Sequence, residues 1–328
     1  MVIIPLIIMS KDRKIFIAGH SGLAGKAISH VLAKNGYSNL LTRTHDELDL
    51  TNQADTRDFF NIEQPDIAIL AAAKVGGILE NYSNPVAHIY NNLMMECNVI
   101  NAAYEAGTRD ILFLGSVCIY PKYADEPVKE NSLLTGELEP TNEAYAVAKI
   151  AGIKLCEAYN RQFNTRYYSI MPANLYGPHD NFHPERSHVI PGLIRRFHDS
   201  KVNGIKDIEI WGTGTARREF LYSEDMANAC MVVMNKYFFS DHTTGWDTRI
   251  NVGVSQDISI GELVDIIKDV VGYRGNIVYN TNKPDGTKSR LMDSSIINEL
   301  GWKPVTGLKE GIEKTYKWFV ENHATVRL

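Results

Sequence analysis

Near its N-terminus the chain reads Lys14-Ile15-Phe16-Ile17-Ala18-Gly19-His20-Ser21-Gly22-Leu23-Ala24-Gly25. The apolar run 14–18 predicts a strand, and the apolar spacing that continues to residues 31–32 predicts a helix. Glycines between a strand and a helix let the backbone approach a diphosphate, which binds the N–H groups of the helix N-terminus. A turn with only a structural role is the alternative, because the G-x-x-G-x-x-G spacing differs from the usual fingerprint. The dinucleotide contacts predicted here are Gly19, His20, Ser21, Gly22, Leu23, Ala24 and Gly25.

Alternating strand and helix patterns continue after the glycine turn. Residues 38–42, 66–70 and 111–114 are short apolar runs that predict strands, and residues 85–106 and 145–163 have helical length and periodicity. Such alternation is typical of a parallel sheet with helices on both faces. The sequence therefore predicts an α/β fold: a Rossmann-type doubly wound parallel sheet with a smaller C-terminal α/β lobe.

The length of 328 residues exceeds the size at which one core usually divides into two. We expect an N-terminal extension over residues 1–10, whose natural start could be Met9. Residues 11–178 are predicted to form the cofactor-binding domain, to which segments at about 215–255 return. Residues 179–328 are predicted to form mainly a substrate-binding lobe.

Composition narrows the functional class. The net charge of −5 argues against general binding to nucleic acid or to a membrane surface. The four cysteines include no C-x-x-C pair, so we expect neither a metal site nor a disulfide framework, and a reducing, cytoplasmic setting. The apolar run at residues 2–9 is too short to span a bilayer.

Arg43 follows the second predicted strand, where a dinucleotide-binding fold places the adenosine ribose. An acidic residue here usually contacts a free 2′-OH, whereas arginine suits a 2′-phosphate. Arg43 therefore favours NADP(H) over NAD(H). A solvated arginine on a loop is the alternative interpretation.

Tyr145 and Lys149 are four residues apart and so share one helix face. A lysine ammonium beside a tyrosine favours the phenolate and is expected to lower the tyrosine pKa. Tyr145 could then exchange a proton with a carbonyl or an alcohol, and Ser116, at the end of an earlier strand, could hold the same oxygen. A simple surface pair on an amphipathic helix is the alternative.

These features resemble the extended short-chain dehydrogenase/reductase family, whose members use Ser, Tyr and Lys beside a nicotinamide. Longer stretches of sequence extend this resemblance: residues 71–77, 114–121, 138–143, 171–184 and 283–286. They are similar to the members that act on GDP-linked sugars. The resemblance implies NADP(H) as cofactor and further cofactor contacts by Leu114, Gly115, Lys149, Pro172, Ala173, Asn174, Leu175 and His188.

The same resemblance implies a catalytic set of Ser116, Cys118, Tyr145, Lys149 and His188. Cys118 and His188 would exchange protons at the carbons flanking a keto group, which inverts them, and the keto group would then be reduced. The implied reaction converts GDP-4-keto-6-deoxy-D-mannose to GDP-L-fucose by 3,5-epimerisation and 4-keto reduction. The implied substrate contacts are Arg196, Trp211, Arg218 and Lys283.

Other interpretations of this pattern stay open. The substrate could be a 3,6-dideoxy sugar, as in a GDP-colitose synthase, or the enzyme could be a simple 4-reductase. A catalytically silent NADP-binding regulator could have the same fold. The family dimerises through helices that match residues 85–106 and 145–163, so a homodimer is expected.

Overall fold

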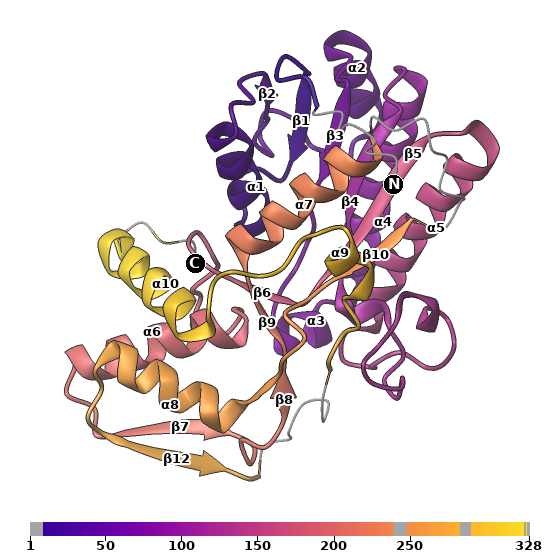
Figure 1. The fold of residues 1–328 in the computed structure, drawn as a ribbon. Helices are drawn as coiled ribbons and strands as arrows, with labels where there is room; N and C mark the ends of the chain where they lie inside the picture. The colour runs from indigo at the N-terminus through magenta and orange to yellow at the C-terminus, as the bar shows by residue number, and fades with distance from the viewer. Residues whose placement is uncertain (1–8, 239–247, 283–289, 325, 327–328) are drawn as a thin grey trace.

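The computed structural model describes residues 9–238, 248–282, 290–324 and 326. Its larger lobe is built on a parallel six-stranded sheet of order β10-β5-β4-β3-β1-β2 (Figure 1). Apolar strands buried on both faces form its centre, which confirms the predicted doubly wound sheet. The strands are β1 (Ile15–Ala18), β2 (Leu40–Leu41), β3 (Ile67–Leu70), β4 (Asp110–Leu114), β5 (Arg166–Pro172) and β10 (Arg249–Val252).

Helices cover both faces of this sheet (Figure 1). On one face α1 (Leu23–Lys34) packs against α7 (Ser223–Tyr237), and on the other α4 (Pro85–Glu105) packs against both α2 (Gln53–Glu63) and α5 (Glu143–Phe163). The two long helices confirm the prediction, and α5 begins two residues before Tyr145. Strand β2 is shorter than the predicted 38–42 because, as an edge strand, it pairs only with β1.

The smaller lobe contains a second hydrophobic cluster. Three two-stranded sheets lie in or beside it, and α8 starts with a capping box between Ser259 and Glu262. The elements are β6 (Asn174–Tyr176) with β9 (Phe220–Tyr222), β7 (Asp207–Trp211) with β12 (Asn276–Asn280), β8 (Arg217–Arg218) with β11 (Ile258–Ser259), and helices α6 (Val189–Val202), α8 (Ile260–Val271) and α10 (Leu308–Asn322). The short elements are α3 (Ile78–Ser83), α9 (Ser295–Glu299) and the 3-10 turns η1 (Val117–Ile119) and η2 (Glu130–Ser132).

Late segments of the chain return to the larger lobe. Helix α7 and strand β10 belong to it, as the sequence suggested, and so do Met292, Ile297 and Trp302, which the sequence did not indicate. The indole of Trp302 donates a hydrogen bond to the Asp225 carbonyl oxygen at 3.1 Å. The chain therefore crosses between the two cores several times.

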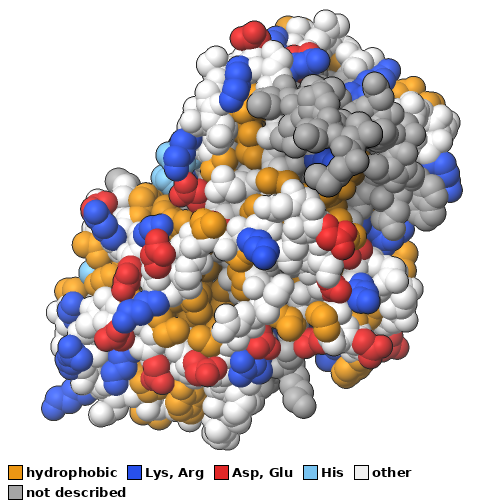
Figure 2. All heavy atoms as spheres, viewed as in Figure 1, with side chains coloured by type: hydrophobic (Ala, Val, Ile, Leu, Met, Phe, Trp, Pro, Cys, Tyr) orange, Lys and Arg blue, Asp and Glu red, His pale blue; other side chains and the backbone are white. Residues whose placement is uncertain are grey.

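The surface in Figure 2 mixes lysine and arginine with aspartate and glutamate over both lobes. On that face the positive side chains do not gather into one broad patch. Among the described helices, none is long and apolar enough to cross a membrane.

Candidate active site

The glycine turn lies at the carboxyl edge of the parallel sheet, between β1 and α1. Gly19 has φ +81°, and a Cβ there would lie 2.6 Å from the Ala72 backbone nitrogen, in the loop after β3. A Cβ on Gly25 would lie 2.1 Å from the Gly19 carbonyl oxygen. Since β1 lies between β2 and β3, this turn is at the point where the strand order reverses. That is where such folds bind dinucleotides.

The polar groups of the glycine turn also suit a bound diphosphate. Gly22 is the N-cap of α1 and makes no side-chain cap, so the first N–H groups of the helix have no side-chain acceptor there. Within the described chain, His20 Nδ1 is buried and lacks a hydrogen-bond partner. A phosphate oxygen satisfies both kinds of donor.

Arg43 follows β2 and is held by its neighbours. Its Nη2 lies 2.8 Å from Glu63 Oε1, its Nη1 donates to the Thr42 carbonyl oxygen, and its guanidinium lies 5.5 Å from the Phe59 ring centre. These contacts place it at the carboxyl end of β2 with about a third of the side chain exposed. The position is compatible with binding a 2′-phosphate.

Ser116 and Cys118 lie in one turn after β4. Ser116 is the N-cap of η1, and its Oγ accepts a hydrogen bond from the Cys118 backbone N–H at 3.2 Å. Asn142, just before α5, donates from Nδ2 to the Cys118 sulfur at 3.3 Å. The thiol is thus fixed between the loop after β4 and the start of α5.

Tyr145, in the first turn of α5, lies beside this group, since Cys118 and Ser116 both act on its pKa. Burial raises the pKa of Tyr145 above its ordinary value, Cys118 and Glu96 raise it further, and the hydrogen bond with Ser116 lowers it. The His88 ring lies edge-on to Tyr145, with ring centres 6.5 Å apart. The half-buried phenol of Tyr145 is suited to donate a proton.

Lys149 differs from the expectation. Its Nζ lies 3.1 Å from Glu96 Oε1, a buried carboxylate on α4, and 5.9 Å from the Tyr145 ring centre. The sequence predicted a lowered pKa for Tyr145, but burial is the largest influence and raises it, and Lys149 is not among the groups that act on it. Sequence spacing alone does not indicate a carboxylate at this place.

Two arginines act on Cys118. Burial raises the pKa of the thiol, whereas Ser116, Arg290 and Arg218 lower it, in that order. Arg290 is buried and donates from Nη1 to the carbonyl oxygens of Tyr120 and Pro121, both at 3.1 Å. Arg218, which the resemblance gave as a substrate contact, thus acts on the Cys118 thiol, and Arg290 is a cation that the sequence did not reveal.

His188 is the N-cap of α6, and its side chain is accessible to solvent. Neighbouring protein nevertheless surrounds the ring closely enough for burial to lower its pKa, which favours neutral imidazole. The preceding segment touches the loop after β3, since Gly77 N–H donates to the Arg186 carbonyl oxygen at 3.0 Å. His188 thus follows a segment that is fixed at the carboxyl edge of the sheet.

Two other predicted substrate contacts, Arg196 and Trp211, lie in the smaller lobe. Arg196 on α6 donates to the Glu209 carbonyl oxygen of β7 at 2.8 Å, and burial lowers its pKa. Trp211, at the end of β7, is 46% exposed. Lys283 lies outside the described residues.

The predicted cofactor residues at the ends of β4 and β5 share the carboxyl edge of the sheet with the glycine turn. Asn174 begins β6, and its Nδ2 donates to the Glu219 carbonyl oxygen at 2.9 Å. The residues concerned are Leu114, Gly115, Pro172, Ala173, Asn174 and Leu175.

The sequence did not indicate four residues that lie near the catalytic group: His88, Glu96, Asn142 and Arg290. For Glu96 the helical period indicated an interior position but not the partner Lys149. Residues 92, 96, 99 and 103 are buried along one face of α4, so a carboxylate at 96 occupies an interior helix position. Asn142 lies inside the string 138–143 that carried the resemblance.

The chain belongs to the NAD dependent epimerase/dehydratase family, whose model matches residues 15–253. This confirms the resemblance to the extended short-chain dehydrogenases/reductases. It is similar to GDP-L-fucose synthase 1 of Arabidopsis thaliana, with 51% identity over 95% of this chain and 94% of that protein. GDP-L-fucose synthase of Escherichia coli K12 is 50% identical over 97% of this chain and 100% of its own. A solved GDP-L-fucose synthetase from Naegleria fowleri bound to NADP superposes with a TM-score of 0.88 at 29% identity, covering 98% of each chain.

Proposed function

We propose that this protein converts GDP-4-keto-6-deoxy-D-mannose to GDP-L-fucose with NADPH, by 3,5-epimerisation followed by 4-keto reduction. The observation that carries the proposal is the convergence of Ser116, Cys118 and Tyr145 at the sheet edge that also carries the glycine turn. Relatives named GDP-L-fucose synthase, about half identical along nearly the whole chain, support the choice of substrate.

The reduction requires a proton donor at the keto oxygen. NADPH, when bound, supplies the hydride. The hydroxyl groups of Ser116 and Tyr145 bind the oxygen, and Tyr145 gives it a proton as the alcohol forms. The raised pKa of Tyr145 keeps the phenol protonated until that step.

The epimerisations require a proton to leave one face of each carbon and another to arrive at the opposite face. Cys118 and His188 are proposed for these two roles. Arg218, Arg290 and the amide of Asn142 stabilise a thiolate at Cys118, and the lowered pKa of His188, caused by the neighbouring protein, favours a neutral base. While the carbon carries negative charge, Ser116 and Tyr145 stabilise the enolate oxygen.

The remaining assignments follow the two cores. We assign residues 11–178, with 215–255, to cofactor binding and residues 179–328 mainly to the substrate lobe. Arg196 and Arg218 are proposed to bind the diphosphate, Trp211 a ring of the nucleotide sugar, and Lys283 a further substrate oxygen. The cofactor contacts proposed are those named in the sequence analysis, with Lys149 and His188 near the nicotinamide ribose.

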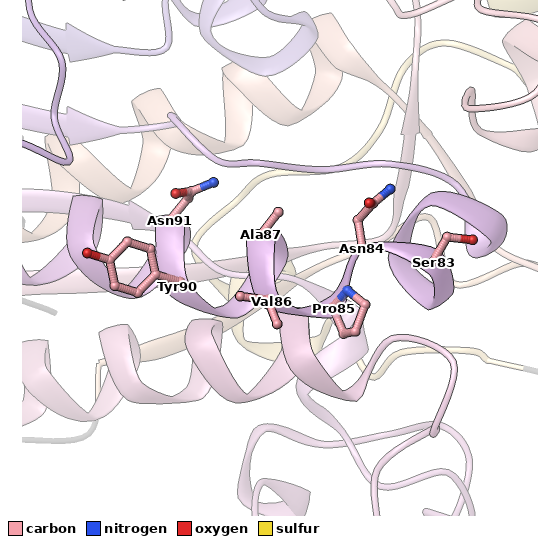
Figure 3. Close-up of a pocket in the computed structure, with 7 residues that line it drawn as sticks. All are labelled: Ser83, Asn84, Pro85, Val86, Ala87, Tyr90 and Asn91. Carbon is pink, nitrogen blue, oxygen red and sulfur yellow. The ribbon is translucent and has the colours of Figure 1, made fainter.

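A homodimer is proposed through α4 and α5. Val86 and Tyr90 on α4 are 74% and 59% exposed, and Val147 on α5 is 38% exposed. Val86 and Tyr90 also line a surface hollow of about 430 Å³ at the start of α4. Figure 3 shows the residues that line it, from Ser83 to Asn91. Exposed apolar side chains of this kind favour association. The cysteine pattern supports a cytoplasmic location.

The direct test incubates the purified full chain with NADPH and GDP-4-keto-6-deoxy-D-mannose, follows the loss of NADPH absorbance and identifies the product by NMR. GDP-L-fucose is expected. No consumption of NADPH would contradict the proposal. Reduction without inversion at C3 and C5 would indicate a simple 4-reductase, and a preference for a 3,6-dideoxy substrate would indicate a colitose-type enzyme.

A further inference from the structure

Three potential metal ligands meet on the surface of the smaller lobe, where α6 lies beside α10 (Figure 1). His198 and Asp199 lie in the C-terminal half of α6, and His323 is the C-cap of α10. Each offers one ligand atom, and the three atoms all lie within 4.8 Å of one another. Within the part of the chain that the structure describes, no other three histidine, cysteine or carboxylate groups meet this closely.

The ring of His198 is held in place by two residues of α10. Its Nδ1 lies 3.1 Å from the Tyr316 hydroxyl oxygen, and the ring lies edge-on to the buried ring of Phe319, with ring centres 5.3 Å apart. A histidine that binds a metal through one nitrogen usually makes a hydrogen bond through the other, which fixes the tautomer and the direction of the ring. Tyr316 supplies that hydrogen bond at Nδ1, so Nε2 is the nitrogen left for a metal.

The carboxylate of Asp199 is supported in a similar way. Its Oδ2 lies 3.3 Å from Nε of Arg195, one turn earlier on α6, whereas its Oδ1 lies 3.8 Å from His323 Nε2. Arg195 therefore orients the carboxylate and leaves Oδ1 facing the histidine of α10. The side chains of Asp199 and His323 are 40% and 47% exposed, so an ion can reach them from solvent.

This set of ligands suits a divalent transition metal such as zinc. Two imidazoles and one carboxylate bind zinc in proteins, with water at the fourth position, whereas calcium and magnesium prefer oxygen ligands alone. At bond lengths of about 2.0–2.2 Å, the ligand atoms of a tetrahedral site lie roughly 3.4 Å apart. The widest separation in the cluster must therefore shorten by roughly 1–1.5 Å. The exposed side chain of His323 can make that movement by rotation.

We propose that His198, Asp199 and His323 bind one Zn²⁺ ion or a similar divalent transition-metal ion, with water as the remaining ligand. The ion links the end of α10 to α6 and so stabilises the smaller lobe. It takes no part in the proposed reaction, because His188, at the start of α6, lies about 15 Å along the helix from His198. The argument from the cysteines against a metal site does not apply here, since no cysteine takes part.

The test titrates Zn²⁺ into the full chain, prepared without a histidine tag, by isothermal titration calorimetry. The wild type should bind one ion per chain in a saturable manner. His323→Ala and Asp199→Asn should each weaken this binding by about tenfold or more, because each removes one of three protein ligands. Thermal unfolding gives a second measurement: Zn²⁺ should raise the Tm of the wild type and leave that of His323→Ala unchanged, since an ion that binds only the folded chain stabilises it.

His45→Ala is the matched control. His45 is an exposed histidine whose Nδ1 lies 3.8 Å from Asp49 Oδ1, the same separation as between His323 and Asp199, but no third ligand joins this pair in the described chain. His45→Ala should therefore bind Zn²⁺ as the wild type does.

Three results would overturn the proposal: no saturable binding by the wild type, equal binding by His323→Ala, or a loss in His45→Ala as large as that in His323→Ala. Circular dichroism shows whether each variant is folded. If Asp199→Asn does not fold, His323→Ala decides, because its exposed side chain can be removed without opening the core. None of these measurements depends on turnover, so they leave the proposed function to its own test.

Discussion

The amide Nδ2 of Asn142 donates a hydrogen bond to the sulfur of Cys118 at 3.3 Å and so joins the start of α5 to the turn after β4. A donor at sulfur favours the thiolate, which is the form that removes a proton from carbon. Asn142 is therefore expected to support the epimerisation rather than the hydride step.

Asn142→Ala should slow deuterium exchange from solvent into C3 and C5 by about tenfold, the loss expected for one hydrogen bond to a charged group. Cys118→Ser should nearly abolish that exchange while NADPH still binds, and Cys97→Ser, at an exposed thiol on α4, should change neither. Adding Asn142→Ala to Cys118→Ser should have little further effect. A normal exchange rate in Cys118→Ser would remove that residue from the chemistry.

Arg43→Ala should weaken NADPH binding by about tenfold or more and NADH binding little, because only NADPH carries the 2′-phosphate. Dissociation constants from cofactor fluorescence give the ratio. Arg13, paired with Asp66 at 3.0 Å at the opposite end of the sheet strands, offers a control in Arg13→Ala. Equal losses for both cofactors would show that Arg43 does not select between them.

Gly25→Ala should abolish cofactor binding and lower the free energy of unfolding by about 2 kcal/mol or more, since the new methyl group would overlap the Gly19 carbonyl. Urea unfolding monitored by circular dichroism measures this change. Gly307, the N-cap of α10, has φ −66° and no atom within 4 Å of the place where a methyl group would lie, so Gly307→Ala should be nearly neutral. Tight cofactor binding by Gly25→Ala would contradict the role given to the turn.

The double variant Val86→Glu/Tyr90→Glu should convert the proposed dimer to a monomer, because it places charge on the apolar surface of α4. Light scattering after size-exclusion chromatography reports the mass. Val305→Glu, at a residue 82% exposed and outside that surface, should leave the mass unchanged. A dimer that survives in the double variant would require another interface.

Local sequence patterns were sufficient to predict much of the fold. The glycine turn, the buried strands and the two long helices were predictable because hydrophobic periodicity and backbone freedom are properties of short segments. The chain order of Ser116, Cys118 and Tyr145 likewise placed them at one edge of a parallel sheet, since every strand of such a sheet ends on the same side.

The charges around those residues depended on tertiary packing. Glu96 meets Lys149 across two helices, and Arg290 reaches Cys118 from a segment more than a hundred residues away. Electrostatic energy depends on distance and solvent exposure, neither of which is encoded in sequence spacing between separate elements. The sequence by itself determined the fold class and which side chains could do the chemistry, and the tertiary structure decided which charged groups surround them.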